Sequence, residues 1–166
     1  EIHIDDIKAG LDLYDYFFEI GKDFNLKAGS PNLIERIEGG LLSYGNDMDI
    51  GDNPFECGFD KYVHLESDIV FLGKENLKKI KEKGIKKKLM GVKIESTTIS
   101  INEGIPILDL DNNEIGELRS GAFSPRFKKI VGIAMVKKDF SNISQKFQIK
   151  LNDKLVSGEI CSLPIL

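Results

Sequence analysis

The sequence predicts an α+β protein with a region of helices and extended segments over residues 1–85 and a six-stranded antiparallel β-barrel or Greek-key domain over residues 86–166. Apolar residues recur at helical spacing in the first part. Six short apolar runs separated by turn signals follow Gly84, which is typical of an antiparallel β domain. The composition, 41% hydrophobic and 30% charged, falls in the range of folded globular chains.

The chain opens with a predicted strand and helix. Glu1–Ile4 alternates polar and apolar residues, so that Glu1 and His3 share one face. Asp5 and Asp6 offer an N-cap. Residues 10–25 then carry Leu13, Phe17, Ile20 and Phe24 at three- and four-residue spacing, which predicts an amphipathic helix that packs one face on a sheet.

Two shorter helices and a loop are expected before residue 85. Ser30 and Pro31 indicate the start of a helix over residues 32–38, because proline is favoured at the first helical position. Residues 43–54 are rich in Gly, Asn and Asp and predict an irregular loop, a kind of segment that is often functional. Residues 55–63 return to an extended pattern, and residues 73–83 predict a lysine-rich helix.

The second part consists of six predicted strands. Turn signals separate them, among them Asp111-Asn112-Asn113 and Ser124-Pro125. The runs are Val92–Ile94, Ile105–Leu108, Glu114–Leu118, Ile130–Val136, Phe147–Leu151 and Leu155–Ile160.

Charge and composition exclude several classes of function. A net charge of −4 argues against binding nucleic acid through a broad basic surface, and no apolar run is long enough to cross a membrane. Cys57 and Cys161 stand far apart, and neither His3 nor His64 has a ligand at metal-binding spacing, so no metal site is expected. We expect reduced, buried cysteines and a cytoplasmic protein.

Two segments leave a structural and a functional interpretation open. Eight lysines lie between Lys74 and Lys88, which favours a solvated helix face over a surface that attracts an anionic tail. Residues 33–47 concentrate polar groups beside apolar ones. Arg36 there either binds a ligand next to Gly39 and Gly40 or forms a surface pair with a neighbouring glutamate.

Three ordered motifs resemble the aminomethyltransferase family, which contains the glycine-cleavage T-protein. They are Arg36-Ile37-Glu38-Gly39-Gly40-Leu41 with Tyr44-Gly45-Asn46-Asp47, then Phe71-Leu72-Gly73-Lys74-Glu75, and Gly116-Glu117-Leu118-Arg119-Ser120-Gly121-Ala122-Phe123-Ser124-Pro125. Within the family, residues 31–36 and 53–62 look most similar to dimethylsulfoniopropionate demethylases.

The resemblance implies a tetrahydrofolate-dependent methyltransferase that takes its methyl group from a small molecule, with dimethylsulfoniopropionate as the expected donor. Residues 1–85 would be the C-terminal part of an α/β folate-binding lobe, and residues 86–166 the family's C-terminal barrel. The alternatives are T-protein aminomethyl transfer, which alone would involve a lipoyl carrier protein, and the folate-binding lobe of a methylglycine dehydrogenase.

The resemblance also implies site residues. Glu1 and Arg36 match the family's folate-site Glu and Arg, and Tyr44 is a neighbour of that pocket. A carboxylate can accept two adjacent N–H groups of a pterin ring, and a guanidinium can bond ring or substrate oxygens. No catalytic residue is expected in this chain, because the family's catalytic carboxylate lies in the first lobe. We therefore expect a fragment that is inactive alone.

Overall fold

The computed structural model describes residues 2–29, 32–101 and 103–165. The chain divides into two compact units, residues 1–31 and 32–166.

The first unit is one helix with a short extension. Helix α1 (Ile7–Ile20) begins after Asp6, whose carboxylate accepts the Ala9 amide at 2.7 Å, and the 3₁₀ helix η1 (Lys22–Phe24) follows it. The predicted helix and its cap are therefore confirmed, although α1 starts earlier and ends earlier. Residues 2–4 have no regular structure where a strand was expected, and Glu1 lies outside the described residues.

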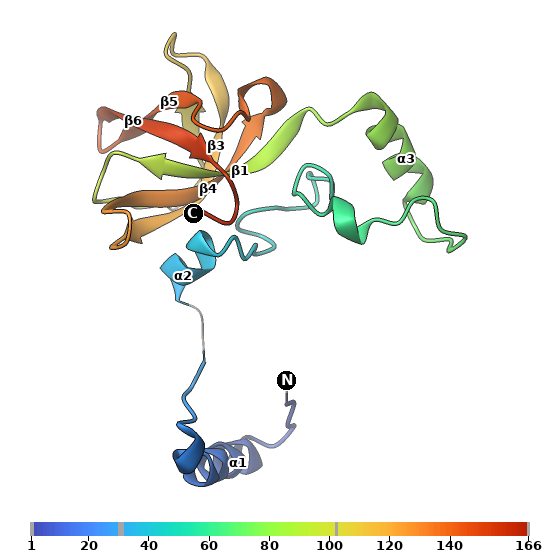
Figure 1. Cartoon of the computed structure of the whole chain (residues 1–166), viewed down its shortest axis with the longest axis vertical. Coiled ribbons are helices and arrows are strands. Elements are labelled where there is room, and N and C mark those ends of the chain that lie inside the picture. Colours follow the sequence, from blue (N-terminus) through green and yellow to red (C-terminus); the bar gives the residue numbers. More distant parts are fainter. Residues whose placement is uncertain (1, 30–31, 102, 166) are drawn as a thin grey trace. The chain divides into compact units, whose positions relative to one another are not determined.

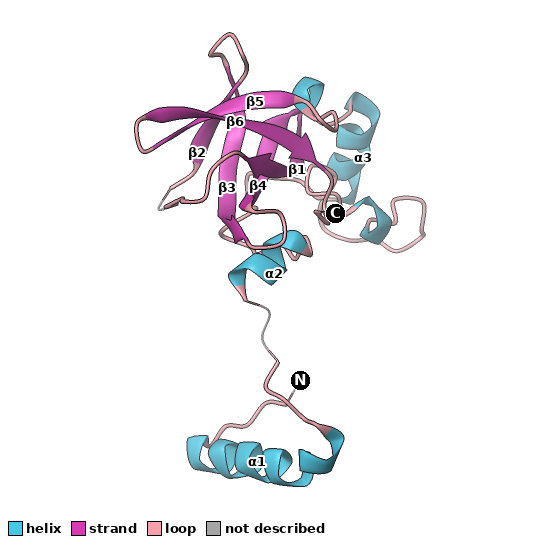
Figure 2. Ribbon diagram, turned by 60° about the vertical axis from the view of Figure 1, so that its left-hand side comes forward, coloured by secondary structure: helices cyan, strands magenta, loops and turns pink. Residues whose placement is uncertain are grey.

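The second unit is built around a closed β-barrel (Figures 1 and 2). All neighbouring strands are antiparallel, and the order around the barrel is β1-β4-β3-β2-β5-β6. The strands are β1 (Lys87–Ile94), β2 (Ile105–Leu108), β3 (Glu114–Ser124), β4 (Lys129–Lys137), β5 (Lys146–Leu151) and β6 (Lys154–Cys161). A 3₁₀ helix, η3 (Lys138–Phe140), follows β4.

The order of the strands is that of a Greek key. Strands β2, β3 and β4 follow one another, and β1 returns to lie between β4 and β6. Each of the six predicted runs lies within one strand, so the predicted six-stranded antiparallel barrel is confirmed. The barrel interior is filled by apolar side chains, with Val92, Ile94, Leu118, Phe147 and Ile149 fully buried.

A second hydrophobic core covers the outer wall of the barrel. Helix α2 (Leu33–Glu38) places Ile37, which is fully buried, against outward-facing residues of β4 such as Val131 and Ile133. Strand β4 is therefore buried on both faces along Ile130–Val136. This outer core fixes α2 and the loop behind it to the barrel.

Helix α2 is capped by a residue other than the one expected. The Asn32 side chain accepts the Glu35 amide at 2.9 Å, and the Glu35 carboxylate accepts the Asn32 amide at 3.2 Å, which forms a capping box. The expected cap at Ser30 and the first helical position at Pro31 lie outside the described residues.

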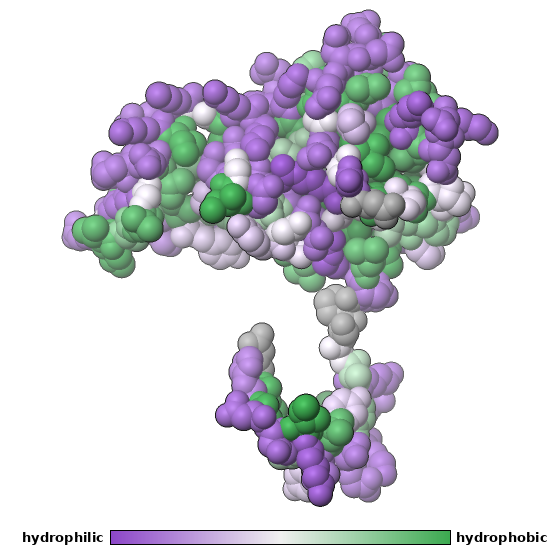
Figure 3. All heavy atoms as spheres, turned by 180° about the vertical axis from the view of Figure 1, so that it is seen from behind, coloured by the Kyte–Doolittle hydropathy of each residue, from purple (hydrophilic) through white to green (hydrophobic). Residues whose placement is uncertain are grey.

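The segment between α2 and the barrel is mostly irregular, as predicted for residues 43–54. The extended pattern expected for residues 55–63 is wrong, because this stretch forms turns, with Gly58 at a φ of 76°, and the 3₁₀ helix η2 (Asp60–Tyr62). Helix α3 (Lys74–Lys83) confirms the lysine-rich helix. Just before it, Ile69, Val70 and Leu72 are exposed, and apolar residues are visible among the polar ones in Figure 3.

Every strand that the structure describes belongs to the barrel, and residues 32–85 share a compact unit with it. The α/β lobe and the division at residues 85 and 86 stay predictions. Among the described residues, no helix has the length and apolar character that crossing a membrane requires.

Candidate functional site

Arg36 lies in the last turn of α2 and is held by three acceptors. Its Nη1 donates to the Leu41 carbonyl at 3.0 Å and to Asp47 Oδ2 at 2.6 Å, and its Nη2 donates to Ser120 Oγ at 3.1 Å. The expected alternative, a surface pair with Glu35 or Glu38, is wrong. The arginine instead joins the helix, the loop and the barrel.

Asp47 is the acidic partner in this arrangement and is fully buried. Its Oδ2 also accepts the Ser43 amide at 2.6 Å, so that one oxygen takes two short hydrogen bonds. The other oxygen, Oδ1, has no hydrogen-bond partner among the described residues. The carboxylate is therefore fixed from one side only.

A β-bulge in β3 brings two consecutive residues to this interface. Pairing with β4 shifts between Leu118 and Ser120, and Leu118 packs in the barrel core. The next two side chains both bond the loop or α2: Arg119 reaches Asp47 and Ser120 reaches Arg36. Strict alternation would point one of these two side chains into the barrel. Because of the bulge, β3 instead provides two consecutive side chains to the contact with the loop and α2.

A second contact between α2 and β3 lies further along the same strand. The fully buried Ser124 donates through Oγ to Glu38 Oε1 at 2.6 Å and accepts the Phe127 amide at 3.1 Å. Arg126 lies 4.0 Å from the other oxygen of Glu38 and is largely exposed. Three residues of the first motif, Arg36, Glu38 and Asp47, are thus hydrogen-bonded to three residues of the last motif, Ser120, Ser124 and Arg119.

Asp52 anchors the far end of the loop. Its carboxylate accepts Arg119 Nη1 and Lys87 Nζ, both at 2.5 Å, and the Asp49 amide at 3.0 Å. Burial alone would raise its pKa, but the hydrogen bonds from Arg119 and Lys87 outweigh it and lower the pKa to about 2. One of the eight clustered lysines is therefore a structural residue of this interface.

Gly39 and Gly40 end α2 beside the last residues of the chain. A Cβ at Gly40, which has a φ of 65°, would lie 3.5 Å from Leu163 Cβ and 3.5 Å from Pro164 Cα. The Ile165 amide also donates to the Glu38 carbonyl at 2.8 Å. The backbone of residues 163–165 therefore approaches the end of α2 closely. They also border a groove of about 520 Å³ that Leu89, Met90 and Leu163 help to line.

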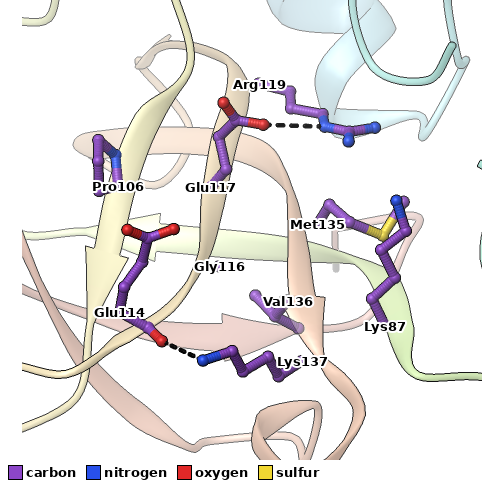
Figure 4. A pocket seen from close by; sticks show the side chains of 9 residues that line it. All are labelled: Lys87, Pro106, Glu114, Gly116, Glu117, Arg119, Met135, Val136 and Lys137. Atoms are coloured by element: carbon purple, nitrogen blue, oxygen red, sulfur yellow. Dashed lines mark hydrogen bonds and ion pairs between the residues drawn. The ribbon is translucent and has the colours of Figure 1, made fainter. Parts of the chain in front are cut away.

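Another hollow, of about 280 Å³, lies on the outer wall of the barrel (Figure 4). Its cationic side chains are already paired: Arg119 with Glu117 at 3.4 Å and with Asp52, and Lys137 with the Glu114 carbonyl at 2.6 Å. Arg119 uses four of the five N–H groups of its guanidinium. Arg36 carries the same five N–H groups but is less fully paired. Three of them are used, and the Nε–H and one N–H of Nη2 have no partner among the described residues.

The predicted site residues fare differently. Arg36 is held by three acceptors and is partly accessible, with a side chain 18% exposed. Tyr44 is exposed and forms an isolated bridge with Met48, without a contact to Arg36 in the recorded hydrogen bonds. Glu1 is outside the described residues, so its predicted role stays a prediction. Within the described ranges, no cluster of three or more His, Cys, Asp or Glu side chains could hold a metal ion.

Comparison with known proteins agrees with this architecture. Residues 87–166, the whole barrel, match the family model of the glycine cleavage T-protein C-terminal barrel domain. Through this barrel, the chain belongs to the glycine-cleavage T-protein family. The family assignment made from three motifs is confirmed.

Individual relatives include proteins of two named activities. The dimethylsulfoniopropionate demethylase DmdA of Ruegeria pomeroyi is 35% identical over 136 residues, which are 82% of this chain and 36% of the relative. An aminomethyltransferase of Thermosipho melanesiensis is 38% identical over 129 residues, which are 78% of this chain and 34% of the relative. The chain thus spans about a third of the length of these T-protein-family relatives.

A solved structure of the family has the same fold. The glycine cleavage system aminomethyltransferase T from Bartonella henselae superposes with a TM-score of 0.71 at 25% identity, covering 79% of this chain and 37% of that one.

In this T-protein-family chain, sequence reasoning missed most of the residues that surround Arg36. Asp47 and Ser120 stood in the quoted motifs but were not assigned a role. The available signal was an acidic residue in a polar loop, eleven positions after an arginine. The loop geometry that brings the two side chains together was not predictable.

Proposed function

We propose that this chain is part of a tetrahydrofolate-dependent methyltransferase, that dimethylsulfoniopropionate is the methyl donor, and that Arg36 contacts the folate. Family membership supports folate-dependent group transfer at a coarse level. The leading donor rests on residues 31–36 and 53–62 and on the similarity to DmdA.

The proposal rests on the hydrogen bonding and exposure of the Arg36 guanidinium. The guanidinium is held by three acceptors, retains two N–H groups without a recorded partner, and is 18% exposed. An arginine that served only to join α2 to the loop would have no need of an accessible edge. A planar fork with two remaining donors suits a carbonyl or carboxylate oxygen.

Tetrahydrofolate fits this donor set, because its pterin ring and its glutamate both present oxygen acceptors, and when bound it supplies the N5 atom that receives the methyl group. Methyl transfer from a sulfonium expels a neutral thioether, so it requires alignment and exclusion of water more than proton transfer. Arg36 would contribute orientation. In the same proposal, Glu1 accepts pterin N–H groups, Tyr44 lies near the pocket, and residues 1–85 belong to the folate-binding lobe.

T-protein aminomethyl transfer is the second candidate, since most of the similar curated relatives are named aminomethyltransferases. There the carbon leaves a lipoyl aminomethyl group on a carrier protein and ammonia departs. A folate-binding lobe of a methylglycine dehydrogenase is the third candidate, and a dinucleotide-binding glycine motif elsewhere in the full-length protein would favour it.

The decisive experiment supplies the full-length protein with tetrahydrofolate and each donor in turn. Methyl-tetrahydrofolate and the demethylated thioether are expected from dimethylsulfoniopropionate. Turnover with an aminomethyl-lipoyl carrier and none with the sulfonium would overturn the choice of donor in favour of the T-protein reaction.

The role of Arg36 has its own test, a binding titration of tetrahydrofolate to the full-length protein. Arg36→Ala would leave Asp47 buried without its cation, so Arg36→Lys is the informative variant. The lysine keeps the charge but loses the planar fork, and we expect a loss of about 1.5–3 kcal/mol in binding free energy. Arg126→Lys is the matched control. Arg126 is 62% exposed, and its distance of 4.0 Å from Glu38 makes a weak ion pair.

A further inference from the structure

We propose that Asp47 is the positioning residue of Arg36, and that together with Ser120 it sets which edge of the guanidinium faces the ligand. The inference rests on the proposed function of Arg36. It adds Asp47 of the loop and Ser120 of the barrel to the site residues expected from sequence, which were Glu1, Arg36 and Tyr44.

The first argument is the rigidity of the Asp47 carboxylate. Its Oδ2 receives the Ser43 amide and Arg36 Nη1, each at 2.6 Å, and the residue is fully buried. The backbone amide belongs to the turn that follows α2 and does not move with a side chain. The carboxylate can therefore impose a direction on the arginine rather than follow it.

The second argument is the number and origin of the anchors on Arg36. The Leu41 carbonyl, Asp47 Oδ2 and Ser120 Oγ come from the end of α2, the loop and β3 respectively. Three acceptors on two nitrogens fix both the plane and the rotation of a guanidinium. No described residue accepts a hydrogen bond from the Nε–H or from one N–H of Nη2. These two groups are therefore the edge of the guanidinium that we assign to the ligand.

The third argument is energetic. A buried carboxylate with an oxygen that makes no hydrogen bond costs stability, and replacing such an ion pair by apolar residues is often neutral or stabilising. Asp52, the neighbouring buried acid, shows the contrast, because both of its oxygens accept hydrogen bonds. Asp52 has the character of a structural ion pair, whereas Asp47 retains an oxygen that the described residues do not satisfy.

The same contrast provides a matched control. Asp47 and Asp52 lie on one loop, both have buried side chains, and each pairs with an arginine at 2.6 or 2.5 Å. Only Asp47 touches Arg36. Substitution of either acid by asparagine removes one buried charge from the same interface, so the two variants share the effect on folding and differ in the effect on Arg36.

The experiment measures the tetrahydrofolate dissociation constant and the unfolding midpoint of the full-length protein for Asp47→Asn, Asp52→Asn and Ser120→Ala. We expect both asparagine variants to lose stability. Asp47→Asn should also bind tetrahydrofolate about tenfold more weakly, because Arg36 loses the charge-assisted hydrogen bond that orients it. Asp52→Asn should bind within about twofold of wild type. Ser120→Ala, a milder change that keeps the ion pair, should weaken binding by about threefold.

A double variant separates positioning from direct contact. If Asp47 acts through Arg36, adding Asp47→Asn to Arg36→Lys weakens binding by no more than about twofold beyond Arg36→Lys alone. Additive losses would mean that Asp47 acts independently of Arg36 and would overturn the inference.

Two further outcomes distinguish the inference from the function on which it rests. Weaker binding in Arg36→Lys with unchanged binding in Asp47→Asn, or equal losses in Asp47→Asn and Asp52→Asn, would overturn the positioning role and leave Arg36 as a ligand contact. Unchanged binding in Arg36→Lys would instead remove Arg36 from the folate site, and the positioning role with it.

Discussion

Ser124 Oγ donates a hydrogen bond of 2.6 Å to Glu38 Oε1 and so joins the end of β3 to the last residue of α2, 86 positions earlier in the chain. The serine is fully buried. Together with the Arg36 to Ser120 bond, this contact gives two side-chain hydrogen bonds between α2 and β3, which hold the helix on the barrel.

Ser124→Ala should destabilise the protein by about 1–3 kcal/mol, because Glu38 and the Phe127 amide both lose a buried partner. Urea denaturation measures the change. Ser157→Ala, at an exposed position of β6, is the control and should stay within about 0.5 kcal/mol of wild type. Equal effects of the two changes would show that the link to α2 contributes nothing.

Asp52 should make the stability of the protein depend on acidity. Its pKa is lowered from 3.8 to about 2 in the folded state, so its contribution is complete above the unfolded pKa of about 4 and is lost as the pH falls towards 2. We expect a loss of about 2 kcal/mol over that window. In Asp52→Asn the unfolding free energy should fall less steeply between pH 4 and pH 2, and an unchanged slope would contradict the assignment.

Gly132 in β4 should not accept a side chain. A Cβ there would lie 2.5 Å from the Ser120 carbonyl oxygen and 2.6 Å from Leu118 Cδ1, at the bulge that presents Ser120 to Arg36. Gly132→Ala should cost about 1–3 kcal/mol of unfolding free energy, since backbone must move.

Gly10→Ala is the matched control for that change. Gly10 lies within α1, and a Cβ there meets nothing within 4 Å. Alanine is favoured over glycine in a helix by about 0.5–1 kcal/mol, so thermal unfolding should show no loss for this variant. A loss at Gly10 as large as that at Gly132 would contradict the steric argument.

Cys57 and Cys161 should resist alkylation in the folded protein. Both thiols are buried and unpaired, and burial raises the pKa of each to about 11, so little thiolate forms at pH 8. Mass spectrometry after iodoacetamide treatment should find both unmodified in buffer and modified in denaturant. Rapid labelling of the native protein would show that the outer core around them opens.

The barrel was predictable from sequence because its signals are local. Each strand is a short apolar or alternating run between turn residues. In Phe147–Leu151, buried residues alternate with more accessible ones with period two. Residues 55–63 misled because apolar residues at extended spacing also occur in turns. There the positive φ of Gly58 decides the conformation.

The arrangement around Arg36 was less predictable because it depends on register. The motifs identified Arg36, but the bond to Ser120 spans 84 positions and exists only because a bulge shifts β3 by one residue after Leu118. Nothing in the sequence near Arg119 marks that shift. Asp47 lies closer, but its side chain reaches Arg36 only through the tight turns of residues 43–47.

The two-sided burial of β4 has a consequence for how this protein can change over evolutionary time. In an ordinary barrel strand, every second position faces solvent and accepts a polar residue. Lys150 in β5 is an example. In β4, Val131 and Ile133 face α2, while Ile130 and Ala134 face the barrel interior. Neither set of alternate positions along this strand therefore faces solvent. Accepted substitutions along this strand should therefore be confined to apolar residues of similar volume. Polar substitutions should instead be found on the outward-facing positions of strands that α2 does not cover.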